Sequence, residues 1–242
     1  MADRHWVKEL VDKLNHSKKV GIVTGKFLDQ SGQYFDSAGD TYTSWGLPYP
    51  KARGEKVGTA YNQSQDIFAA TGGASMYRAE MFRQIGLFDE DFFAYYEDVD
   101  LSFRAQLSGW KVAYVPRAIA YHQIGATSSK IKGFTTYQTM KNLPLLFWKN
   151  VPLRLLPAMS LRFKLAYFLF FMSAVKRGQG WYAIKGFLRM LTLFPKKLFQ
   201  RSNIQKNRKV SNNYIRSILI YDLPPNATKL RHLRRKWWQL IG

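Results

Sequence analysis

Two glycines and three acidic residues have the types and spacing that a binding site can use. Gly72 and Gly73 are adjacent, and a glycine pair lets the backbone approach a ligand closely. Glu97, Asp98 and Asp100 lie within four positions of each other, directly after an aromatic run. Carboxylates crowded beside aromatic rings tend to have shifted pKa values, which suits a general base or a metal ligand. The plainer interpretation is an acidic first turn of a helix, which the helix dipole favours.

A histidine and an arginine accompany these acids. His122 ends a β-rich run and follows Asp98 by 24 residues, enough for a helix, a turn and a strand to return the chain to the acids. A lone histidine at a strand end is either a hydrogen-bonded structural residue or a ligand. Arg104 lies on the same predicted helix as the acids. It can reach a diphosphate or brace the acidic cluster as an ion pair, and the sequence leaves both roles open.

The elements that must position these residues alternate between strand and helix. Hydrophobic spacing and breaker residues predict helices at 5–14, at 78–85 and from 97 to a stop at Gly109. They predict strands at 20–24 with an extension at 26–29, and at 65–70, 112–115 and 119–121, the last two separated by Pro116. This alternation favours an α/β fold.

Charge divides the chain into two parts. Residues 1–126 hold 14 Lys and Arg against 15 Asp and Glu, whereas residues 127–242 hold 23 against 1. We therefore expect a domain boundary near residue 127, with a catalytic α/β part at 1–126 and a basic helical part at 127–242. The chain has no cysteine, which fits a reducing cytoplasm, and its charged first residues do not resemble a signal peptide.

The basic part combines cationic and apolar residues. Prolines predict short helices and turns over 135–156, and the apolar run 163–175 has 13 residues, fewer than the roughly 20 that cross a bilayer. Residues 181–194 form an amphipathic pattern ended by Pro195, and the basic cluster 231–238 contains two tryptophans. This composition predicts an anionic membrane surface as partner of residues 160–242. Simple packing of the helices on the α/β part is the alternative.

A long ordered series of residues resembles the second half of the family 2 glycosyltransferases, in particular their bacterial rhamnosyltransferase-like branch. The series comprises Gly72-Gly73-Ala74, Arg78, Phe82, Gly86, Phe88-Asp89-Glu90, Phe92-Phe93, Tyr96-Glu97-Asp98-Val99-Asp100-Leu101, Arg104, Gly109-Trp110, Val115-Pro116, His122 and Ser128. The resemblance implies a GT-A fold and inverting transfer of a sugar from a nucleotide-sugar. Together with the basic helices, the resemblance predicts a lipid-linked saccharide or polysaccharide acceptor and a cytoplasmic protein that is peripheral on the inner face of the membrane.

The resemblance assigns roles to individual residues. It implies that Asp98 is the catalytic base and that His122 is a ligand of a divalent metal, Mn or Mg. Positions expected to bind substrate are Gly72, Gly73, Glu97, Asp100 and Arg104.

The same family carries an N-terminal nucleotide-binding half that ends in an Asp-x-Asp motif. The strings Asp89-Glu90-Asp91 and Asp98-Val99-Asp100 fall inside the later motif, and we do not interpret either as that donor-metal motif. We therefore expect a chain lacking the N-terminal half. The alternative is a non-catalytic remnant that binds a membrane or a partner chain. Nucleic-acid binding is less favoured, because no zinc-finger spacing or RNA-recognition signature accompanies the charge.

Overall fold

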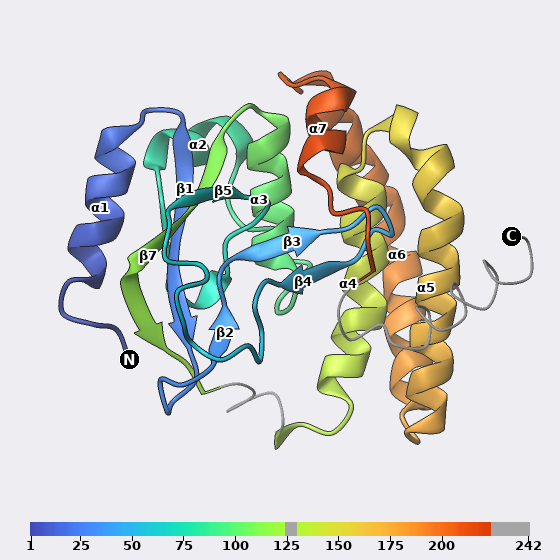
Figure 1. Cartoon of the computed structure of the whole chain (residues 1–242). Coiled ribbons are helices and arrows are strands. Elements are labelled where there is room, and N and C mark those ends of the chain that lie inside the picture. Colours follow the sequence, from blue (N-terminus) through green and yellow to red (C-terminus); the bar gives the residue numbers. More distant parts are fainter. Residues whose placement is uncertain (124–129, 224–242) are drawn as a thin grey trace, which may run out of the picture.

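The computed structural model describes residues 1–123 and 130–223 as a mixed α/β part followed by long helices (Figure 1). Ser128 and the basic cluster 231–238 lie outside the described residues. The helices are α1 Trp6–His16, α2 Ala79–Ile85, α3 Glu97–Leu107, α4 Phe134–Asn150, α5 Leu156–Lys176, α6 Gly180–Lys206 and α7 Asn212–Ile218, with short 3₁₀ turns η1 Gly72–Ala74 and η3 Leu153–Leu155. The strands are β1 Val20–Leu28, β2 Phe35–Ser37, β3 Asp40–Tyr42, β4 Pro48–Pro50, β5 Gln65–Ile67, β6 Ser75–Tyr77 and β7 Lys111–Tyr121.

A five-stranded sheet forms the centre of the α/β part. Its strands follow the order β2-β1-β7-β5, and β6 also pairs with β1. The pair β1 and β7 is parallel, whereas β2 and β6 run antiparallel to β1. The helix α1 packs against β1 and β7 on the left of Figure 1, and α3 lies between the sheet and α4. The α/β prediction is confirmed.

The region around Pro116 differs from the prediction of two strands. A single strand, β7, runs through it, and its register against β1 shifts between the pairs Gly25–Val115 and Lys26–Ile119. A Cβ at Gly25 would lie 2.0 Å from the Ala118 carbonyl oxygen. A bulge opposite a glycine therefore accommodates the proline, which cannot donate to the ladder.

The prolines of the basic part do not end its helices as predicted. Pro144 lies inside the 17-residue α4 and Pro195 inside the 27-residue α6. An internal proline removes one hydrogen bond and strains the helix, but α4 is buried on nearly every side. Tertiary packing on both sides of each proline outweighs the local cost.

The helix α5 is also longer than the predicted apolar run. It has 21 residues, and the segment Leu153–Lys176 reaches the length and composition that a membrane span requires, with a hydropathy of 1.4. Only 22% of its most apolar window is buried in the protein. The helix is therefore longer than the predicted 13-residue apolar run within it, so length alone does not exclude a membrane span.

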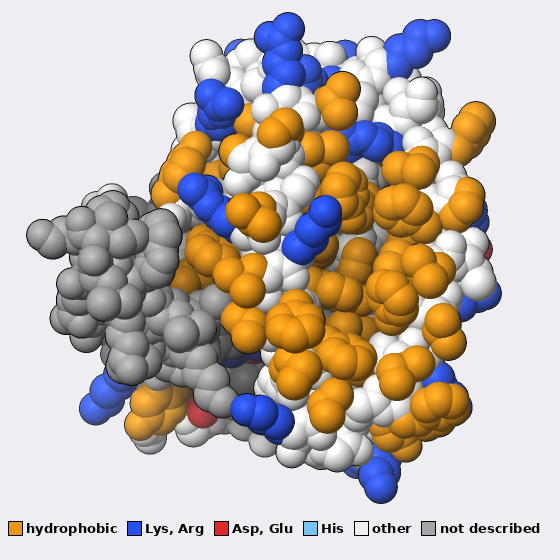
Figure 2. All heavy atoms as spheres, turned by 90° about the vertical axis from the view of Figure 1, so that its right-hand side faces the viewer, with side chains coloured by type: hydrophobic (Ala, Val, Ile, Leu, Met, Phe, Trp, Pro, Cys, Tyr) orange, Lys and Arg blue, Asp and Glu red, His pale blue; other side chains and the backbone are white. Residues whose placement is uncertain are grey.

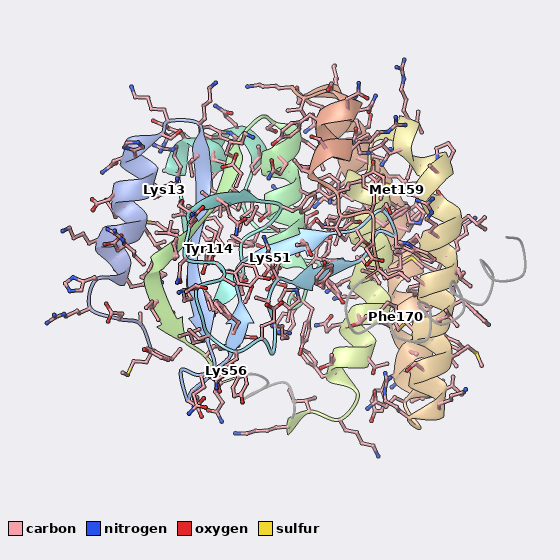
Figure 3. The ribbon with its side chains drawn as sticks, viewed as in Figure 1. Lys13, Lys51, Lys56, Tyr114, Met159 and Phe170 are labelled. Atoms are coloured by element: carbon pink, nitrogen blue, oxygen red, sulfur yellow. The ribbon has the colours of Figure 1, made fainter. Side chains whose placement is uncertain are left out.

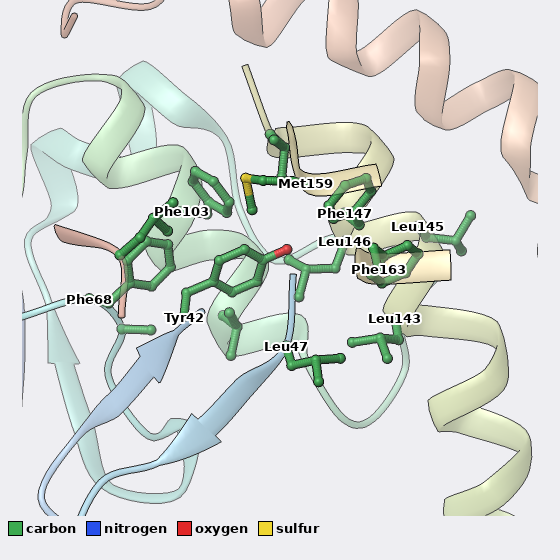
Figure 4. Packing of buried hydrophobic residues seen from close by; sticks show 14 of the residues in the cluster. Tyr42, Leu47, Phe68, Phe103, Leu143, Leu145, Leu146, Phe147, Met159 and Phe163 are labelled. Atoms are coloured by element: carbon green, nitrogen blue, oxygen red, sulfur yellow. The ribbon is translucent and has the colours of Figure 1, made fainter. Parts of the chain in front are cut away.

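One hydrophobic core joins the two parts of the chain. Tyr42, Phe68 and Phe103 of the α/β part cluster with ring centroids 5.0–5.2 Å apart. The same core includes Phe147 of α4 and Phe163 of α5, whose rings stack at 4.2 Å. Figure 4 shows these residues together, and Figure 3 places Met159 at this junction, with Tyr114 in the sheet. The boundary near residue 127 stays a prediction, but the core crosses it.

Candidate active site

The backbone of Gly72 holds Asp98 in place. The Gly72 N–H donates to Asp98 Oδ2 at 2.8 Å, and the Val99 N–H donates to Asp98 Oδ1 at 2.8 Å. A Cβ at position 72 would lie 3.2 Å from both Cβ and Oδ2 of Asp98. Gly72 is therefore needed for space, because any side chain would press on the carboxylate.

The backbone that leads into helix α3, which carries the acids, is strained. It begins after Tyr95 and Tyr96, whose φ angles of 67° and 71° lie in the left-handed region. The Asn142 side chain of α4 donates to the carbonyl oxygens of Phe92, Ala94 and Tyr95. A buried amide from the helical part thus fixes the turn that precedes Asp98.

Three carboxyl groups here have raised pKa values. Burial raises the pKa of Asp98, and hydrogen bonds from the Gly72 and Val99 backbone partly offset that effect. Burial, followed by the charge of Asp98, raises the pKa of Glu97 to about 7. The pKa of about 7 places proton exchange of Glu97 near neutral pH, and a raised pKa makes Asp98 a better proton acceptor, as general-base chemistry requires.

Asp40 of β3 is the third of these groups, and sequence reasoning missed it. Burial and the nearby charge of Asp98 raise the pKa of Asp40 to about 7, while Arg53 and hydrogen bonds from Ser37 and Thr71 act in the opposite direction. The Thr71 hydroxyl donates to Asp40 Oδ1 at 3.3 Å. Asp40 precedes Asp98 by 58 positions, so no local spacing relates the two.

A cavity of about 370 Å³ opens beside the glycines. Its wall includes Gly72, Gly73, Phe27 and His122, with the remainder supplied by Met1, Ala2, Trp6, Ala74, Ser75, Ala120 and Tyr121. Asp98 is partly buried and does not line this cavity, but it is bonded to Gly72, which does. The predicted glycine pair therefore forms the link between the carboxylate and the cavity.

His122 also lines the cavity and is held by an acid. Its Nδ1 is 2.6 Å from Asp36 Oδ2, and Arg53 pairs with Asp36 Oδ1 at 2.7 Å. A carboxylate on one ring nitrogen fixes the orientation of the imidazole, so that a ligand would meet Nε2. Among residues 1–123 and 130–223, no group of three His, Asp or Glu side chains is placed to hold a metal ion. His122, with Asp36 beside it, is therefore not part of a described group of three such side chains.

Asp100 and Arg104 do not fit the predicted role in substrate binding. Asp100 is fully buried and bonds to Arg104, Lys149 and Asn150. The Arg104 guanidinium also donates to the carbonyl oxygens of Ile85, Gly86 and Leu87. Every nitrogen of Arg104 is thus occupied, and of its two proposed roles the structural ion pair is the one observed.

Comparison with known proteins identifies the family. The model of the glycosyl transferase family group 2 matches residues 2–182. The chain belongs to this family. This glycosyltransferase family member also resembles two curated relatives, the N-acetylglucosaminyl-diphospho-decaprenol L-rhamnosyltransferases of Mycobacterium tuberculosis strains CDC 1551 / Oshkosh and ATCC 25618 / H37Rv. Each is 44% identical over 130 residues, which cover 48% of this chain and 41% of the relative.

These matches confirm the resemblance seen in the sequence, including its rhamnosyltransferase-like character. The family match extends past residue 127 into α4, α5 and the start of α6. The match to the two relatives spans about two fifths of their length. Their complete activity is therefore a proposal for this glycosyltransferase family member, which the geometry of the site supports.

Proposed function

We propose that this chain takes part in inverting transfer of a sugar from a nucleotide-sugar to a lipid-linked saccharide or polysaccharide acceptor. The observation that carries the proposal is the partly buried Asp98, fixed by the backbone of Gly72 at the edge of a cavity. The family membership supplies the reaction class. The names of the relatives, which contain a diphospho-decaprenol-linked sugar and L-rhamnose, support the acceptor and donor classes.

In the proposed reaction Asp98 acts as general base. An acceptor hydroxyl attacks the anomeric carbon of the donor, a new C–O bond forms, and the bond to the nucleoside diphosphate breaks. The hydroxyl proton passes to a carboxylate oxygen of Asp98, and the diphosphate leaves with the electron pair. The two backbone N–H groups on Asp98 hold it in one orientation before substrate arrives.

The other residues of the site serve binding. The exposed backbone of Gly72 and Gly73 allows a sugar or phosphate to approach the cavity wall. Glu97 precedes the base in α3, and its raised pKa allows it to donate a hydrogen bond to a sugar hydroxyl near neutral pH. Asp40, which accepts a hydrogen bond from the Thr71 hydroxyl, is a further candidate for binding substrate.

The proposal includes a divalent cation, Mn or Mg, which protein groups including His122 would hold. His122 would contribute its Nε2, with Asp36 fixing the ring. Such a cation supplies Lewis-acid stabilisation of charge on a leaving diphosphate. The base step assigned to Asp98 does not depend on this cation.

The location we propose is the cytoplasmic side of the membrane, with the protein peripheral on its inner face. Its support is the charge of residues 127–242, which hold 23 Lys and Arg against 1 acidic residue. Cationic segments are attracted to anionic lipid.

The test is turnover by Asp98→Asn with a panel of nucleotide-sugars and a lipid-linked acceptor. It is run both in this chain and in a longer chain that carries the segment of the relatives outside the match. We expect a loss of at least about a hundredfold, with donor binding retained in a calorimetric titration. Asp66→Asn on the exposed surface is the matched control. Turnover close to that of the unaltered protein would remove Asp98 from the mechanism.

A further inference from the structure

The helices α5 and α6 present apolar stripes to the outside of the protein. On α5 the exposed positions recur every three or four residues, as Leu161, Leu165 and Phe168, which are 77%, 46% and 56% exposed. On α6 the corresponding residues are Trp181, Leu188 and Leu191, at 62%, 53% and 48%. This spacing is that of one helix face. Figure 2, which looks at this side of the molecule, shows hydrophobic side chains gathered over a broad area.

The opposite faces of both helices are already used. The small and apolar residues of α6 that are buried include Ala183, Gly186 and Met190. A Cβ at Gly186 would lie 2.4 Å from the Tyr137 carbonyl oxygen of α4, so α6 packs closely on α4. On α5, Phe163 stacks on Phe147 of α4, and the Tyr167 hydroxyl donates to the Met140 carbonyl oxygen at 2.7 Å. The outward stripes, which we call the α5–α6 face, are therefore a second apolar surface and not a misplaced core.

Cationic side chains accompany the α5–α6 face. Arg162, Lys164, Lys185 and Arg189 are all exposed on the same two helices, and Lys185 lies over the Trp181 ring at 5.2 Å. Figure 2 shows lysines and arginines mainly around the margin of the apolar area. Helices α4 to α7 contain no Asp or Glu.

This charge distribution selects among possible occupants. A second copy of the chain would bring two cationic surfaces together without acidic partners, so repulsion would oppose the contact. An anionic lipid leaflet offers an apolar environment to the stripes and negative charge to the basic residues around them. Monomeric proteins rarely expose large contiguous apolar areas without a binding role.

We propose that the α5–α6 face docks in the plane of an anionic membrane, with Phe168, Trp181 and Leu188 at the level of the headgroups. The helix α5 does not cross the bilayer in this arrangement, because its inner face stays bound to α4. The docking itself does not depend on the proposed function, and only the reason for docking rests on it. A protein docked in this way would lie on the same membrane as an acceptor carried by lipid.

The experiment measures binding to phosphatidylcholine vesicles with and without phosphatidylglycerol. We expect binding to the anionic vesicles only, weakened by salt. The double variant Phe168→Glu, Leu188→Glu should lower the vesicle partition coefficient at least about tenfold. The matched control is Leu87→Glu, which alters a leucine that is 70% exposed in the α/β part and should bind as the unaltered protein does. Unchanged far-UV circular dichroism verifies that the variants fold.

A second measurement starts from the unaltered protein. Brominated lipids should quench part of the tryptophan fluorescence, and Trp181→Phe should remove that part. Binding is also tested by extraction with alkaline carbonate, which should release the protein.

Equal binding to neutral vesicles, or equal weakening by Leu87→Glu, would overturn the proposal. Resistance to carbonate would replace in-plane docking with a spanning helix. Dimerisation that the double variant abolishes, without vesicle binding, would assign the face to a second copy. None of these readouts uses sugar transfer, so failure of the docking proposal is distinguishable from failure of the proposed sugar transfer.

Discussion

Replacement of Lys197 by methionine tests whether the helical part holds the acidic loop that leads to α3. Lys197 is fully buried, although Lys196 beside it is 59% exposed. Its Nζ lies 2.6 and 2.7 Å from the two oxygens of Asp89 and 2.6 Å from Asp91 Oδ2. Lys149 of α4 also reaches Asp89, at 2.6 Å.

The expected cost follows from burial. The methionine fills a similar volume but leaves Asp89 with one cation where it had two, in a place where its side chain is 6% exposed. Breaking a buried ion pair by removing one partner costs about 3–5 kcal/mol. Because Lys149 remains, we expect a loss near the lower end, about 3 kcal/mol. Lys196→Met removes a contact of 2.8 Å to Asp91 at the surface and should cost less than about 1 kcal/mol.

The assay is urea unfolding followed by tryptophan fluorescence and far-UV circular dichroism, with both variants compared to the unaltered chain. A difference below about 1 kcal/mol between Lys197→Met and Lys196→Met would refute the reasoning. It would mean that Asp89 finds water or another partner once the cation is gone. Coincident transitions by the two probes are required before free energies are compared.

Three further predictions concern the site and its titration. Gly72→Ala should lower turnover about tenfold or more, because the new Cβ would press on Asp98, and unchanged turnover would contradict the contact. Asp98→Asn should lower the pKa of Glu97 from about 7, since the Asp98 charge contributes to its rise. Carbon-13 NMR of the carboxyl groups measures that change, and a constant pKa would exclude the coupling. The cations around Asp89 lower its pKa in the folded state, so its contribution to stability is present above pH ~4 and is lost as the pH falls through the lowered pKa. Urea unfolding across that acidic range should show the loss, and a stability that stays constant on acidification would count against it.

The site illustrates what sequence reasoning can and cannot reach. Gly72 and Asp98 were both identified, because a glycine pair and an acidic helix start have local signatures. Asp40 was not, because a lone aspartate in a loop-rich stretch carries no pattern. Arg104 and Asp100 carried the right family pattern, but only burial revealed that they brace α3.

The sequence by itself determined the alternation of strands and helices and the division between a neutral and a basic part, because both depend on local periodicity and composition. Its ordered series of motif residues indicated the family by resemblance. The tertiary structure decided which members of those patterns meet. Lys196 and Lys197 are adjacent and chemically identical, yet only one enters the interior. Pro144 and Pro195 are local breakers, yet α4 and α6 continue through them. In each case contacts with distant residues exceed the local preference, and those contacts exist only once the chain has folded.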